Sequence, residues 1–349
     1  MLKKNYFLQI FFIFLSLFSL FKLYDNSVSL DAWQYGEWLI NYQNGFIRRG
    51  LVGEIIYILS KLLDNNIQIS LFIIISLFCI SYYFLSYKFL KAINFNFIHY
   101  AILFSPLFYL FFLVISKVGV KKELLLFLFY IFYLINLSSK NFNLSKNWPF
   151  LLVYFVLLFN HELVFFYLPY LFIPVLFIIK KRNFKTLVYQ LLITTIGSLG
   201  ILLLLYIYKG SIDHTLTICA SLKDYAPMKC TWWGPIYALS HNLFININNE
   251  PNMFFYLSGD FKTNILFFIY ISYSIIPILI FFVFYNLNIS RTIIRKDFFY
   301  FLVLFSFVFS LPLFHVAEDW SRWFSIHVHL ISFVILFLYK NNFCTINNI

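Results

Sequence analysis

Residues 31–54 read DAWQYGEWLINYQNGFIRRGLVGE, and they follow directly on the first long apolar run of the chain. The stretch combines two acids with an adjacent pair of arginines and with two glycines that flank the start of the next helical pattern. These residues are Asp31, Glu37, Arg48, Arg49, Gly50 and Gly53, and Glu54 closes the stretch. Because charge beside a bilayer is costly, we expect the chemistry of the protein to begin here.

The composition indicates an integral membrane protein. Of 349 residues, 62% are hydrophobic and only 11% are charged, against about 25% charged in a soluble domain. The mean hydropathy is +0.83. The formal net charge of +12 lies largely in short loops between apolar runs, as the positive-inside rule predicts. We therefore expect the lipid bilayer and lipid phosphate as partners, and no nucleic acid.

Apolar runs of span length predict an all-α polytopic protein that forms a single membrane domain over residues 1–349. The first run follows Lys3 and Lys4 and has no cleavage site after it, which favours a retained signal anchor. About ten spans are expected, at about 6–22, 68–87, 97–116, 124–138, 149–160, 163–179, 187–207, 264–286, 298–314 and 325–339. The segment 51–63 is too short and too charged to span, and is expected to form an interfacial or half helix.

The apolar run 148–179 is interrupted by Asn160, His161 and Glu162, so it forms either one long span or a hairpin. Only the hairpin puts every short basic loop on one side, and this side is then the cytoplasm, with both chain termini. The external face then carries a first loop over 24–67, a turn at 117–123 and a large loop over 208–263.

Two cysteines, Cys219 and Cys230, lie in the predicted large external loop. In an oxidising compartment, two cysteines this close favour a disulfide. The alternative is a pair of free thiols, as expected for Cys79 in a span and Cys344 in the tail.

The segment DAWQYGEW predicts an amphipathic helix on the membrane surface, because Asp31, Tyr35 and Trp38 recur at helical spacing. Asp31 is either a catalytic acid or simply the cap of this helix. In GFIRRGLVGE, Arg48 and Arg49 precede a glycine-led helix start. Arginine binds phosphate oxygens in a bidentate manner, so the pair predicts a diphosphate clamp. The alternative is a pair that reaches up to lipid headgroups.

Three further clusters face the same predicted side. The turn KVGVKKE carries Lys122 as a second phosphate ligand, unless it is only a solvated lysine turn. His161 and Glu162 form a pair at membrane depth that can act as a base, unless they merely cap a helix break. In AEDWSRW, Asp319 and Arg322 share one helical face. Either Arg322 is an anion ligand and Asp319 its orienter or a base, or the two form an intrahelical ion pair. No spacing typical of a metal site is present, and no cofactor is expected.

The set GFIRRGLVGE, KKE, HEL…P and EDWSRW resembles integral membrane proteins of bacterial surface-polysaccharide clusters, the O-antigen or capsule repeat-unit polymerases (Wzy-type). An acid in the first external loop followed by an interfacial helix is similar to the wider GT-C class of polyprenyl-dependent glycosyltransferases. By this resemblance, Asp31 is a catalytic candidate.

The resemblance implies polymerisation of undecaprenyl-diphosphate-linked oligosaccharide repeat units on the external (periplasmic) face of the bacterial inner membrane. Such an enzyme serves O-antigen, lipopolysaccharide or capsule synthesis, and a chain-length regulator is a candidate partner. Arg48, Arg49, Arg322 and Lys122 would bind the diphosphate, and the base would be Glu162 with His161, then Asp31, then Asp319. The alternatives are a lipid-linked oligosaccharide flippase, another GT-C glycosyltransferase, or a membrane O-acyltransferase, whose arginine–histidine motif the first span lacks.

Overall fold

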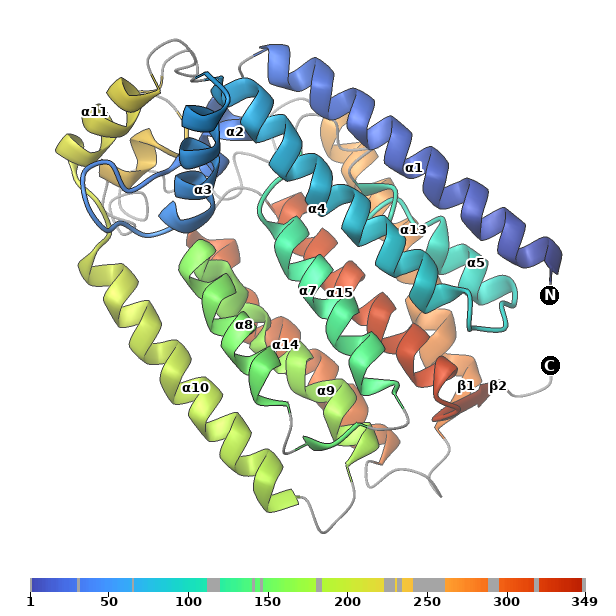
Figure 1. The fold of residues 1–349 in the computed structure, drawn as a ribbon. Helices are drawn as coiled ribbons and strands as arrows, with labels where there is room; N and C mark the ends of the chain where they lie inside the picture. Colours follow the sequence, from blue (N-terminus) through green and yellow to red (C-terminus); the bar gives the residue numbers. More distant parts are fainter. Residues whose placement is uncertain are drawn as a thin grey trace.

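The computed structural model describes the chain as a bundle of helices (Figure 1). The described residues are 2–29, 32–64, 66–111, 120–139, 142–144, 147–179, 184–222, 230, 234–240, 261–287, 295–316 and 320–346.

The elements, in chain order, are α1 (Leu2–Ser29), α2 (Ala32–Leu39), α3 (Gly50–Leu62), α4 (Ile67–Leu90), α5 (Phe97–Leu103), α7 (Glu123–Leu137), α8 (Trp148–Asn160), the 3-10 helix η2 (Glu162–Tyr167), α9 (Leu168–Ile178), α10 (Phe184–Ile207), α11 (Ile212–Ser221), the 3-10 helix η5 (Tyr237–Ser240), α13 (Phe261–Phe284), β1 (Tyr285–Leu287), α14 (Lys296–Val316), α15 (Trp320–Lys340) and β2 (Cys344–Ile346). The two three-residue strands pair antiparallel, with Asn286 opposite Thr345.

The fold is that of a helical membrane protein. Within the described residues, five helices are long and apolar enough to cross a bilayer, namely Lys4–Asp25, Ile67–Leu90, Phe184–Ile207, Lys296–Phe314 and Arg322–Lys340. Four shorter apolar helices accompany them, at Glu123–Leu137, Trp148–Asn160, Glu162–Ile178 and Phe268–Phe284. Large apolar side chains point outward along α1, α10 and α14, as expected for helices that face lipid tails.

The interrupted run 148–179 is a hairpin. The Tyr154 hydroxyl donates a hydrogen bond to the carbonyl of Val164, at 3.5 Å. Ten residues of a continuous helix would separate these positions by about 15 Å, so the chain has to reverse between them. Helix α8 ends at Asn160, His161 is extended with φ −161°, and η2 then leads into α9.

The span expected over 97–116 is not a single helix. Helix α5 ends at Leu103, and turns follow over 104–110. Pro106 explains the break, because a proline ring disfavours the helical conformation of the residue before it, here Ser105. The Leu107 amide is satisfied outside its own segment, since it donates to Ser274 Oγ of α13 at 3.1 Å.

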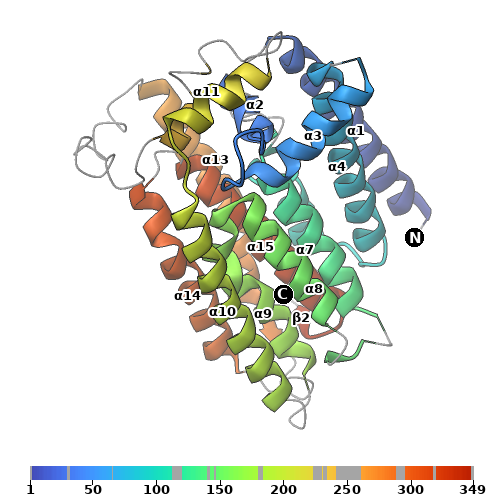
Figure 2. The same ribbon diagram turned by 60° about the vertical axis from the view of Figure 1, so that its left-hand side comes forward.

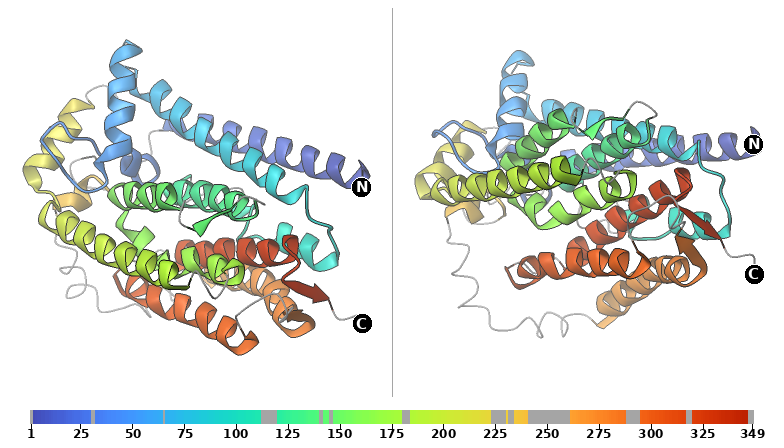
Figure 3. Two further views of the ribbon diagram at one scale, coloured as in Figure 1. Left: turned by 60° about the horizontal axis from the view of Figure 1, so that its bottom comes forward. Right: turned by 90° about the horizontal axis from the view of Figure 1, so that it is seen from below.

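Helix α15 is the centre of the bundle. Of its span, 83% is buried, against 22% of the span in α10. It lies between α14 on one side and α7 on the other (Figure 3). The first turn of α15 therefore brings Arg322 into the interior at one end of the molecule.

The chain termini lie together at one end of the bundle, which we call the terminal end (Figure 1). There Lys4 Nζ donates to the carbonyl of Lys91 at 3.1 Å, which joins the start of α1 to the end of α4. The expectation that this end faces the cytoplasm stays a prediction.

The opposite end, which we call the site end, is covered by α2, α3 and α11 (Figure 2). Helix α1 extends to Ser29, beyond the predicted start of the first loop at residue 24. The expected helix forms as α2, but the described side chains that were expected to face lipid are covered by protein, and the position of α2 relative to a bilayer stays a prediction. Tyr35 is 2% and Trp38 0% exposed, because other segments pack over them. Trp38 Nε1 donates to the carbonyl of Val120 at 2.8 Å.

Candidate functional site

Two local features hold the arginine pair at the site end. Arg49 has a positive φ of 65° and turns the chain into α3, so that both arginine side chains reach the same partner. Gly53 packs on α2, and a Cβ added there would lie 1.8 Å from the carbonyl oxygen of Ile40. Only glycine allows this approach, which explains the second glycine of GFIRRGLVGE.

Glu162 at the hairpin tip is the partner of both arginines. Arg49 Nε lies 3.0 and 2.9 Å from the two carboxylate oxygens, and Arg48 Nη1 lies 3.4 Å from Oε1. Asn160 fixes the tip, because its Oδ1 accepts the Val52 amide at 3.1 Å. One of the amides at the start of α3 is therefore occupied by the protein itself.

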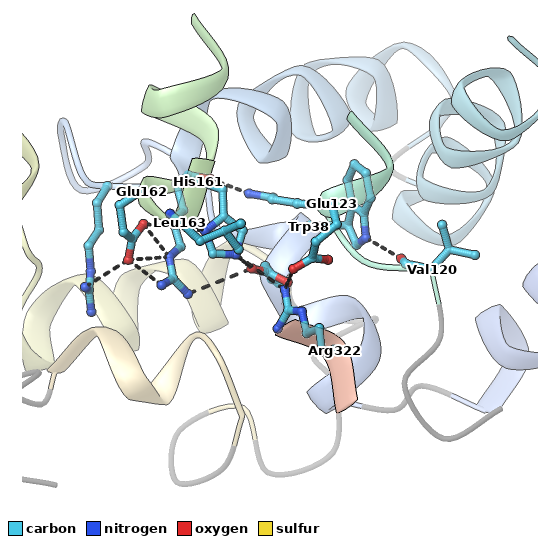
Figure 4. Close-up of polar contacts among 11 residues, drawn as sticks. Trp38, Val120, Glu123, His161, Glu162, Leu163 and Arg322 are labelled. Atoms are coloured by element: carbon cyan, nitrogen blue, oxygen red, sulfur yellow. Dashed lines mark hydrogen bonds and ion pairs between the residues drawn. The ribbon is translucent and has the colours of Figure 1, made fainter. Parts of the chain in front are cut away.

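The centre of the site is Glu37 of α2, which the sequence did not single out as a site residue. Its Oε1 lies 2.6 Å from His161 Nε2 and 3.9 Å from Arg49 Nη1, and its Oε2 accepts from Arg322 Nη2 at 3.2 Å. Glu37 is 1% exposed. Its contacts join Arg49, the hairpin tip and α15 in a single network. Figure 4 shows the polar contacts around His161, Glu162 and Arg322.

Lys122, directly before α7, and Glu123, its first residue, complete the site. Glu123 Oε1 pairs with Arg322 Nη2, and Lys122 Nζ donates to the Arg49 carbonyl at 2.6 Å. Both side chains are buried. We call the eight residues Glu37, Arg48, Arg49, Lys122, Glu123, His161, Glu162 and Arg322 the ionic cluster.

The ionic cluster carries excess positive charge. Four cationic side chains meet three carboxylates, so the formal net charge is +1 when His161 is neutral. Burial lowers the pKa of Arg48 to about 10, which leaves it charged at neutral pH. Its Nε is buried and has no hydrogen-bond partner among the described residues. This arginine therefore keeps a donor that is available to an anionic ligand.

The structure brings most of the predicted site residues together. Arg48, Arg49, Lys122, His161, Glu162 and Arg322 all lie in the ionic cluster. Asp31 and Asp319 lie outside the described residues. Among the described residues, Glu54 pairs with no arginine. Its carboxylate accepts the Tyr42 amide at 2.8 Å and the Gln43 side-chain amide.

A disulfide joins Cys219 to Cys230 in the predicted large external loop. It holds α11, which lies beside the segment that carries the arginines. Asn41 Nδ2 donates to Ser221 Oγ at 3.1 Å, and the Arg48 amide donates to the Tyr208 carbonyl at 3.1 Å. The loop thus supports the ionic cluster from outside.

No group of three or more metal-ligating side chains is arranged around a common point in the described ranges. In comparisons with known proteins, no family model, no curated protein and no solved structure matches the chain. The fold and the site define the class: a helical membrane protein with a buried, cation-rich ionic cluster at one end.

Proposed function

We propose that the protein is a glycosyltransferase that polymerises undecaprenyl-diphosphate-linked oligosaccharide repeat units in surface-polysaccharide synthesis. It would act on the periplasmic side of the bacterial inner membrane, with both termini in the cytoplasm. The donor is a lipid-linked chain and the acceptor a second lipid-linked repeat unit.

The observation that carries this proposal is the ionic cluster with its excess positive charge and the free donor of Arg48. A diphosphate leaving group carries its negative charge on oxygens, and arginine side chains bind such oxygens in a bidentate manner. In a buried site, the attraction is far stronger than in water. Arg48 and Lys122 are the first ligands, and Arg49 and Arg322 contribute positive potential while paired with carboxylates.

The reaction asks little else of the protein. A hydroxyl oxygen of the acceptor forms a bond with the anomeric carbon of the donor sugar. The bond from that carbon to the diphosphate oxygen breaks, and its electron pair leaves with the lipid diphosphate. The hydroxyl proton passes to a base. The site therefore has to neutralise the leaving group, align two lipids and accept one proton.

The position of the charges favours an enzyme over a flippase. The ionic cluster lies at the site end. Along α15 it is followed by the buried polar side chains Ser325, His327, His329 and Ser332, and then only by buried apolar side chains from Phe333 to Leu338. A flippase has to carry a polar head through the bilayer and needs polar groups along that path.

The test is deletion of the gene in its own host, followed by gel analysis of surface polysaccharide. We expect core carrying a single repeat unit and loss of the ladder. Wild-type protein should restore the ladder and Arg48→Ala should not. Arg295→Ala, a change at an exposed arginine near the terminal end, should restore it fully. Complete loss of repeat units on deletion would indicate a flippase instead, and an intact ladder with altered sugars a branching transferase.

A further inference from the structure

Glu37 makes the shorter of the two acid–histidine contacts of His161 in the ionic cluster, 2.6 Å between Oε1 and Nε2. Both side chains are almost fully buried. They come from α2 and from the hairpin tip, which are more than a hundred residues apart. A carboxylate oxygen and a ring nitrogen that both presented lone pairs would repel each other at this distance, so one of the two carries a proton.

The surrounding charges decide where that proton resides. Burial by itself would raise the pKa of the Glu37 carboxyl, but Arg322, His161 and Arg49 outweigh burial and hold this pKa well below its usual range. Glu37 is therefore a carboxylate, and the proton belongs to His161 Nε2. The other ring nitrogen, Nδ1, then carries the lone pair.

The lone pair on Nδ1 is only weakly engaged. Nδ1 accepts the Leu163 amide at 3.4 Å, a long hydrogen bond that the acceptor hydroxyl has to replace. Nδ1 also lies 3.8 Å from Glu162 Oε2. Arg322 Nη2 lies 3.4 Å from Nε2 and could only donate there, so the shorter contact of Nε2 with Glu37, at 2.6 Å, decides that Nε2 carries the proton. Burial lowers the pKa of His161, so the neutral ring is the prevailing form at neutral pH. A neutral ring with a held tautomer and a carboxylate behind it is equipped to accept a proton.

Glu162 is poorly equipped for this role, although the sequence ranks it with His161 as the first base. Arg49 Nε contacts both of its oxygens, at 3.0 and 2.9 Å, and Arg48 approaches one of them. Taking up a proton would remove the charge that holds these two arginines. Glu162 instead keeps the arginine pair in place.

We infer that Glu37 is a positioning residue that holds His161 as the base of the reaction, with Nδ1 as the accepting atom. This inference rests on the proposed function. The acceptor hydroxyl gives its proton to Nδ1 as its oxygen bonds to the anomeric carbon, and the diphosphate leaves with the electron pair of the broken bond. Glu37 then stabilises the imidazolium that forms.

The test is polymerisation by the purified full-length protein in lipid nanodiscs. We expect Glu37→Gln to lower kcat about 100-fold or more, while the affinity for undecaprenyl diphosphate, measured separately, changes less than threefold. The acid limb of the kcat profile should move to lower pH, because His161 loses the carboxylate that favours its charged form. Glu37→Asp should recover part of the rate, and Glu54→Gln should behave as wild type.

Three outcomes separate the alternatives. A wild-type kcat and pH profile in folded Glu37→Gln would overturn the inference while leaving the polymerase intact. Loss of undecaprenyl diphosphate binding in that variant would also overturn it, because Glu37 would then serve the clamp. If the wild-type protein neither binds the lipid diphosphate nor extends it, the proposed function itself fails. Should Glu37→Gln not fold, the tautomer of His161 can be read from nitrogen-15 chemical shifts of the wild-type protein, and protonated Nδ1 with bare Nε2 would overturn the inference.

Discussion

Glu162→Gln should be among the most destabilising single changes at the site end. The carboxylate neutralises two adjacent arginines, with contacts of 2.9 and 3.0 Å to Arg49 and 3.4 Å to Arg48. Two unit charges about 4 Å apart interact by about 4 kcal/mol at an effective dielectric constant of about 20. Removing one partner of a buried pair costs about 3–5 kcal/mol. Because the Arg49 and Glu162 side chains are 20% and 17% exposed, we expect the lower end of this range, a loss of about 3 kcal/mol in the free energy of unfolding.

The reciprocal change should cost less. Arg49→Gln leaves Glu162 with Arg48 as its remaining cation, so we expect a loss of about 2 kcal/mol, below the range for an abandoned buried charge. The double variant should lose less than the sum of the single variants, with a coupling energy of about 1–3 kcal/mol.

The assay is equilibrium unfolding of the purified protein in mixed micelles, with a matched control in the same segment. Glu54→Gln removes a carboxylate that accepts hydrogen bonds from the neutral amides of Tyr42 and Gln43, so it should cost only about 1 kcal/mol. Equal losses for Glu162→Gln and Glu54→Gln would refute the reasoning. So would single effects of Glu162 and Arg49 that add to within about 0.5 kcal/mol.

Three further predictions follow from the geometry. Burial lowers the pKa of Lys122 to about 8, so the affinity for undecaprenyl diphosphate should fall as the pH rises through about 8. Lys122→Arg should remove this fall, because arginine stays charged. An affinity of the wild-type protein that does not change with pH would contradict this prediction. Gly53→Ala forces a Cβ against a main-chain carbonyl and should cost about 3 kcal/mol or prevent folding. Gly200→Ala, where an added Cβ would meet nothing within 4 Å, should be neutral or slightly stabilising. Equal melting temperatures of the two variants would refute this prediction. Cys219→Ser should cost roughly 3 kcal/mol, and a reducing agent should then have no further effect on unfolding; unchanged stability in the variant would show that the disulfide contributes nothing.

Sequence reasoning reached the membrane class and the chain reversal at residues 160–162 because both depend on local composition and on charge in short loops. It missed the end of α5 for a reason that was visible. The pair Ser105–Pro106 stands inside an apolar run, and hydropathy ignores the backbone restriction that proline imposes. The end of α5 was therefore predictable from this local pair, but a prediction based only on the length of the apolar run overlooks it.

Glu37 was missed for a different reason. The pattern DAWQYGEW is amphipathic, and such a pattern places tryptophans at a lipid interface and acids in water. Burial of α2 on all described sides depends on segments far away in sequence, which no local pattern contains. One signal was present: Glu37 has no basic residue three or four positions away, so its charge needed a distant partner once it was buried.

The roles of the individual motifs depend on one another, because the motifs contact each other in the structure. The hairpin tip makes three contacts in succession, from Asn160 to Val52, from His161 to Glu37, and from Glu162 to Arg49. An arginine pair that reached for headgroups would leave the half-buried Glu162 without its two cations, which destabilises the fold. A histidine that only capped a helix would leave Glu37 without its nearest partner. Each motif therefore adopts its role in the ionic cluster because the others do, and their grouping at one end of an apolar bundle is the strongest physical argument for a common ligand.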